Sequence, residues 1–187
     1  SDLWTDSQIA KPETSALACK VASSFGHVLE WTDKSLPPRI VGMVDEKMSM
    51  VRSGNPLVLA KHRANMVRLL LLHDRGGIWI DHDVFLLSIP DVAPPWIAVS
   101  TDGYCSAAMR FNVGDNRLLA AFHTIAPAPS ARECSGELHL AKQWRNSGVN
   151  TVPFPFNANG EPVDPSAGPA WAVHTWHSSN TVRASKR

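Results

Sequence analysis

The chain has 187 residues, of which 44% are hydrophobic and 19% are charged, and its formal net charge at pH 7 is +1. These values are typical of a globular protein, and we expect a single domain over residues 1–187. So small a net charge gives no broad attraction to anionic membranes or nucleic acid, and no basic cluster with interleaved aromatic residues indicates a nucleic-acid protein. No apolar run reaches the roughly 20 residues that a membrane-spanning helix needs.

Three cysteines, Cys19, Cys105 and Cys134, form an odd set without the spacing of a metal site. Such a set argues against a disulfide framework and favours reduced thiols. We therefore expect a cytoplasmic location, with the Golgi lumen as the alternative if a membrane stem has been removed.

The periodicity of apolar residues predicts strands and helices that alternate along the chain, which favours an α/β fold with a mostly parallel sheet flanked by helices. In chain order, the first half is expected to contain a strand over Asp2–Asp6, a helix over Pro12–Phe25, a strand over His27–Trp31, a loop over Leu36–Ile40, and helices over Val41–Arg52 and Pro56–Arg75. The second half is expected to contain strands over Ile97–Ser100 and Ala107–Phe111, helices over Asn116–Ile125 and Glu137–Asn146, a loop over Val152–Pro169, and a strand over Ala170–Trp176.

The most informative segment follows the strongest predicted helix, where Gly76-Gly77 leads into what reads as a buried strand carrying Asp81 and Asp83. Alternate side chains of a strand point to the same side, so we expect Trp79, Asp81 and Asp83 to share one face. Burying two carboxylates together is costly unless a cation or hydrogen-bond donors compensate them, and hard oxygen ligands suit Mg²⁺ or Mn²⁺. The pair therefore predicts a divalent metal site.

Polar residues form a stripe on the preceding helix, where Lys61, Asn65, Arg68 and Arg75 return to nearly the same side. Because this helix leads through Gly76-Gly77 into the aspartate strand, Asn65 and Arg68 can face the same site as the aspartates. The alternative is that the stripe is only the solvated side of the helix.

The block from Leu59 to Val84 resembles the signature of sugar-nucleotide glycosyltransferases of the Asp-X-Asp type, which include mannosyl-, galactosyl- and capsular polysaccharide-type transferases. The end of the chain, Ala172–Asn180, is similar to the closing His-x-Trp-x-x-Ser-Trp of that family. The resemblance implies a GT-A-like fold and transfer of a sugar from a nucleoside diphosphate sugar, with UDP-sugars favoured over GDP-sugars, to a glycan or lipid-linked acceptor. Two positions depart from the family pattern, because Asn65 stands where Asp is usual and Asn180 stands where Trp is expected.

The resemblance also implies roles for individual residues. Asp83 is expected to bind the metal ion directly, and Asp81 to serve the metal site and partly the ribose or a bound water. A third metal ligand or diphosphate contact is expected from His174. Charge-assisted contacts to the donor sugar or phosphate are expected from Arg68, so that Asp81, Asp83 and Arg68 are the predicted catalytic residues. The remaining predicted donor contacts are Trp4 with the base, Asn65 with a sugar hydroxyl and Ser179 with the diphosphate.

Other residues receive less specific interpretations. Trp79 and Trp176 are interpreted as packing residues. His177 is a weaker candidate than His174 for a role in the site. Asp102 and Asp115 are candidates for a base that activates the acceptor, although nothing in the local sequence distinguishes either of them.

Two other functions remain open. A phosphatase of the haloacid dehalogenase type also places Asp-X-Asp after an apolar strand, with the first aspartate as nucleophile and the second as general acid. Such an enzyme needs a further acidic pair, and no two acidic residues are adjacent in the sequence after Asp83. The second alternative is a non-catalytic module that binds a nucleotide sugar or a metal ion, which the departures at Asn65 and Asn180 allow.

Overall fold

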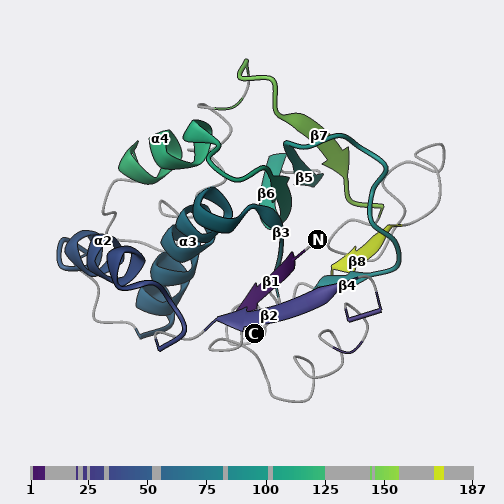
Figure 1. The fold of residues 1–187 in the computed structure, drawn as a ribbon. Coiled ribbons are helices and arrows are strands. Elements are labelled where there is room, and N and C mark those ends of the chain that lie inside the picture. Colours follow the sequence, from purple (N-terminus) through teal and green to yellow (C-terminus); the bar gives the residue numbers. More distant parts are fainter. Residues whose placement is uncertain are drawn as a thin grey trace, which may run out of the picture.

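The structure is a computed structural model, and it describes residues 2–6, 20, 23–24, 26–31, 34–51, 56–81, 84–100, 103–124, 144, 146–155 and 171–174. Figure 1 shows the arrangement of the helices and strands in these segments. The strands are β1 (Asp2–Asp6), β2 (His27–Trp31), β3 (Gly77–Ile80), β4 (Val84–Leu86), β5 (Trp96–Ser100), β6 (Gly103–Phe111), β7 (Asn150–Pro153) and β8 (Ala172–His174), and the helices are α2 (Pro38–Met48), α3 (Pro56–Arg75) and α4 (Asn116–Thr124).

The main sheet has six strands in the order β2-β1-β3-β6-β5-β7, and β4 and β8 form a separate antiparallel pair. β1 runs parallel to β2 and β3, and β5 runs parallel to β7, but β6 is antiparallel to both β3 and β5. The expected GT-A-like, mostly parallel sheet is therefore wrong, because the sheet is mixed. The connection between β5 and β6 explains the difference: β5 ends at Ser100 and β6 begins at Gly103, and so short a connection allows only an antiparallel pair.

The described helices do not flank the sheet on both faces. α2, α3 and α4 gather on one side of the strands (Figure 1). One core cluster joins these helices to strand residues such as Trp79 and Met109, and a second cluster contains Ile78 and Ile80 of the same strand. Because successive side chains of β3 alternate between faces, Trp79 packs with the helices and its two neighbours pack with the other cluster. The second cluster also includes residues of β4, β7 and β8.

The join between α3 and β3 determines where the aspartate segment begins. α3 spans Pro56–Arg75, as the sequence predicts, and the Gly76 N–H donates to the Leu72 carbonyl at 2.9 Å. Gly76 has a φ of 64°, and a Cβ added there would lie 2.8 Å from the Val113 backbone nitrogen. Left-handed backbone and close approach both require glycine, so the sequence ends the helix here and turns the chain directly into β3.

Several other predicted elements agree with the structure, among them β1, β2 and α4. The loop expected over Leu36–Ile40 is partly wrong, because α2 begins at Pro38, and proline is well tolerated in the first turn of a helix. The short strands β4 and β7 were not expected. The helix expected over Pro12–Phe25 and most of that over Glu137–Asn146 lie outside the described residues.

Within the described segments, no helix combines the length and apolarity that crossing a membrane would require.

Candidate functional site

Asp81 lies where β3 ends, at the edge of the parallel part of the sheet. Since β1, β2 and β3 run parallel, their carboxyl ends meet at this edge. β1 lies between β2 and β3 in the sheet, although β2 separates them in the chain. The strand order therefore reverses at β1, and ligands of open α/β sheets bind outside the carboxyl ends of strands at such switch points. Asp81 is thus at the edge where a ligand is expected.

Two donors hold one oxygen of the Asp81 carboxylate. Arg68 Nη2 donates to Asp81 Oδ1 at 2.7 Å, and Trp79 Nε1 donates to the same oxygen at 2.7 Å. The Arg68 side chain is 5% exposed and that of Asp81 is 28% exposed. Among the described residues, no hydrogen bond to Asp81 Oδ2 is found. One oxygen of the carboxylate is therefore held by two buried side chains.

Each of the side chains of Arg68, Trp79 and Asp81 contacts the other two. The Arg68 guanidinium carbon lies 5.0 Å from the centroid of the Trp79 ring, a cation–π distance, and Trp79 itself is fully buried. The strand expected to carry both aspartates ends earlier, at Ile80, so Asp81 follows it. The hydrogen bond shows that Trp79 and Asp81 nevertheless lie on one side, whereas Asp83, expected on the same face, lies outside the described residues. Trp79 was interpreted only as a packing residue, but its indole N–H also fixes Asp81. Arg68 and Trp79 thus supply part of the compensation that the sequence analysis assigned to a metal ion.

Ser106 completes the surroundings of Arg68, and sequence analysis missed it. Arg68 Nη1 donates to the Ser106 carbonyl at 2.6 Å and also to the Ser106 hydroxyl. Ser106 lies in an irregular part of β6: Ile97 of β5 lies opposite Met109, and the next residue, Ala98, lies opposite Cys105. Residues 106–108 therefore have no counterparts on β5. Bulges of this kind redirect side chains and are frequent beside functional sites, but no pattern in the sequence marks this one.

Two predicted site residues are placed by their backbones. Trp4 of β1 lies opposite Trp79 of β3 in parallel register, one strand away from the segment that leads to Asp81. His174 of β8 lies opposite Val84, the residue that follows Asp83 in the chain. The structure therefore brings the backbones of both predicted residues near the aspartate segment, from opposite ends of the sequence. Asp83 and Ser179 lie outside the described residues.

The remaining candidates differ in their surroundings. Asn65 lies on α3 three residues before Arg68 and is half-buried. Residues three apart on a helix lie on the same side, so Asn65 is on the stripe that contains Arg68. Asp102 lies outside the described residues.

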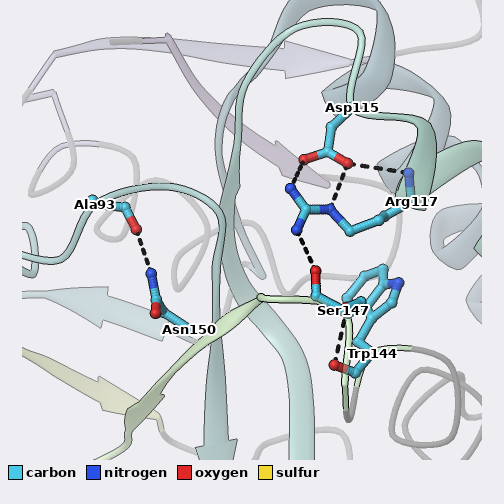
Figure 2. Close-up of polar contacts among 6 residues, drawn as sticks. All are labelled: Ala93, Asp115, Arg117, Trp144, Ser147 and Asn150. Atoms are coloured by element: carbon cyan, nitrogen blue, oxygen red, sulfur yellow. Dashed lines mark hydrogen bonds and ion pairs between the residues drawn. The ribbon is translucent and has the colours of Figure 1, made fainter.

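Asp115, a candidate base, is held in an ion pair at the start of α4 (Figure 2). Arg117 donates through Nε to Oδ1 at 2.8 Å and through Nη2 to Oδ2 at 2.7 Å, and the Arg117 backbone N–H also donates to Oδ1. The same guanidinium donates to the Ser147 carbonyl at 2.7 Å. Burial raises the pKa of the Asp115 carboxyl, but the hydrogen bonds and charge of Arg117 outweigh burial and hold that pKa below its usual value. A carboxylate whose pKa is held below its usual value is a poor base.

Only one described carboxylate at this edge is of the kind that a hard divalent cation prefers. Carboxylate oxygen is the ligand that Mg²⁺ and Mn²⁺ prefer, and the Asp81 side chain is 28% exposed. The described side chains alone contain no group of three or more His, Cys, Asp or Glu residues arranged to hold a metal ion. A complete site would need Asp83 and His174 in addition, whose side chains are not described.

Comparisons with known proteins give no family assignment. The chain matches no model of a protein family, and no curated protein matches it. The geometry of Asp81 and its neighbours, together with the resemblance of the surrounding residues, is therefore the basis for inferring a function.

The ion pair between Arg68 and Asp81 should be strongly coupled in folding. We expect Asp81→Ala to lower the free energy of unfolding by about 2–4 kcal/mol, because it leaves a buried guanidinium without its carboxylate. In the double variant Arg68→Met, Asp81→Ala, the combined loss should be smaller than the sum of the single losses by about 1 kcal/mol or more. Urea unfolding of the four proteins measures this coupling, and strictly additive losses would contradict it.

The Asp115 ion pair should make stability depend on pH. Since the folded pKa lies below the ordinary value of 3.8, the pair stabilises the fold above that pH and loses its contribution as the pH falls through the folded pKa. Asp115→Asn keeps a good helix cap but removes the charge, and it should cost about 1–3 kcal/mol at neutral pH. Urea unfolding at a series of acidic pH values should show that the difference in free energy of unfolding between wild type and Asp115→Asn shrinks as the pH falls. A difference that stays constant with pH would disprove the electrostatic origin.

Proposed function

We propose that this protein is a metal-dependent glycosyltransferase that moves a sugar from a nucleoside diphosphate sugar to a hydroxyl of a glycan or lipid-linked acceptor. UDP-sugars are favoured as donors over GDP-sugars, on resemblance. The observation that carries the proposal is the 2.7 Å contact between Arg68 and Asp81. These residues are the helix arginine and the first aspartate of the Asp-X-Asp segment in the glycosyltransferase-like block. Their contact at the carboxyl edge of the parallel strands supports a common role.

The chain's own residues have distinct parts in this proposal. Asp83 and Asp81 Oδ2 would hold Mn²⁺ or Mg²⁺, with His174 as a further group. When bound, the cation supplies positive charge that offsets the negative charge developing on the leaving diphosphate. Because Asp81 Oδ1 is already fixed by two donors, little side-chain freedom is lost when Oδ2 meets a ligand. The Asn65 amide can donate to and accept from a sugar hydroxyl.

The surroundings of Asp81 argue against the phosphatase alternative. In that mechanism, the first aspartate of the motif attacks phosphorus as a nucleophile. Here, Oδ1 of Asp81 accepts from Arg68 and Trp79, and both donors stabilise the negative charge and so reduce the nucleophilicity of the carboxylate. The same contacts suit a carboxylate that binds a metal ion and orients the donor substrate.

We place the reaction in the cytoplasm, with the Golgi lumen as the alternative. The support for this proposal is the odd set of three cysteines without the spacing of a metal site, which favours reduced thiols and a reducing compartment.

The proposal predicts stabilisation by manganese together with UDP, GDP or one of their sugars. A ligand at 100 times its dissociation constant adds about 2.7 kcal/mol to stability, which a thermal-shift assay detects. Asp83→Ala should lose the metal-dependent shift and the metal-dependent release of nucleoside diphosphate from the donor. Asp91→Ala, which removes an exposed carboxylate near β5, is the matched control and should retain both.

Two results would refute the assignment. One is the absence of stabilisation by every UDP- and GDP-sugar with manganese. The other is full metal-dependent donor cleavage by Asp83→Ala. Binding with no turnover toward any acceptor or water would instead support the non-catalytic module.

A further inference from the structure

We infer that Ser106 is a positioning residue of the candidate site, which acts on the ligand-facing carboxylate of Asp81 through Arg68. Its link to a ligand rests on the proposed function, but its effect on Asp81 does not. Ser106 belongs to none of the motifs that suggested the site. It lies on β6, whereas Arg68 lies on α3 and Asp81 follows β3.

The first support is the distribution of the Arg68 donors. Nη2 donates to Asp81 Oδ1, while Nη1 donates to both the carbonyl and the hydroxyl of Ser106. Nε has no hydrogen-bond partner among the described residues. Within the described part of the chain, Asp81 and Ser106 therefore determine the in-plane orientation of the guanidinium, and the Trp79 ring supports one of its faces.

The second support is the shape of β6. Residues 106–108 have no counterparts on β5, so the Ser106 carbonyl is not required by a regular ladder on that side and can accept from Arg68. One residue thereby offers two acceptors to one guanidinium nitrogen. A regular strand would not present its carbonyl and side chain in this way, because carbonyls lie along the ladder and side chains stand perpendicular to it.

The third support is burial. Ser106 is 8% exposed and Arg68 is 4% exposed, whereas a larger fraction of Asp81 reaches solvent. A ligand at the edge of the sheet would therefore meet Asp81 and not Ser106. Without the Ser106 hydroxyl, Arg68 loses a charge-assisted bond and gains freedom to move. As a result, Arg68 holds Asp81 Oδ1 less firmly. The orientation of Asp81 Oδ2 toward a ligand is then also less well defined.

Three variants test this inference without assuming the function. Ser106→Ala removes the hydroxyl, and Ser106→Thr retains it. Ser147→Ala is the control, because it removes a hydroxyl that bonds to the Trp144 carbonyl at 3.0 Å, away from Asp81. The readout is the ¹H–¹⁵N indole signal of Trp79, assigned with Trp79→Phe, since this N–H donates to Asp81 Oδ1. The signal should move in Ser106→Ala, stay in Ser147→Ala and return toward the wild-type position in Ser106→Thr.

A second readout addresses the ligand. Ser106→Ala should weaken binding of manganese with UDP by about tenfold, the size expected for losing one hydrogen bond to a charged group, and Ser147→Ala should not. An unchanged indole signal in Ser106→Ala would overturn the positioning role, even if stability falls. If wild type binds no nucleotide, the proposed function fails, but the indole signal still decides the role of Ser106.

Discussion

The ion pair between Arg68 and Asp81 is the interaction on which the candidate site depends. The guanidinium is buried between a helix and a sheet, where an unpaired charge would be costly. The pair therefore constrains α3 and the end of β3 to one relative position, and Gly76 makes this possible by ending the helix within a single residue of the strand. Folding and the arrangement of the site are thus coupled. A substitution that breaks the ion pair of Arg68 disturbs both the core and the carboxyl edge of the parallel strands, where Asp81 lies.

The ion pair also gives Asp81 a role that differs from the one proposed for Asp83. Asp81 Oδ1 accepts from Arg68 and Trp79, and in our proposal Oδ2 is the oxygen that meets a ligand. The charge of Arg68 offsets that of the partly exposed Asp81 carboxylate. Asp83 lies outside the described residues, and in our proposal it is the principal metal ligand.

Sequence analysis predicted those features that depend on local periodicity. The apolar spacing and the glycine pair gave α3 its bounds, and the alternation of a strand correctly placed Trp79 and Asp81 on one side. The direction of β6 was missed because its first residues, from Gly103, were not recognised as strand, which hid the short connection to β5. Ser106 could not be found at all, because its contact with Arg68 depends on an irregular register between distant strands.

Anomalous diffraction at the manganese edge, from crystals grown with Mn²⁺ and UDP, tests the central claim most directly. The account predicts a manganese peak beside Asp81, with Oδ2 directed at the ion or its bound nucleotide and Oδ1 still accepting from Arg68. A peak elsewhere in the molecule, or a bound nucleotide that leaves Asp81 Oδ2 without a contact, would contradict the account.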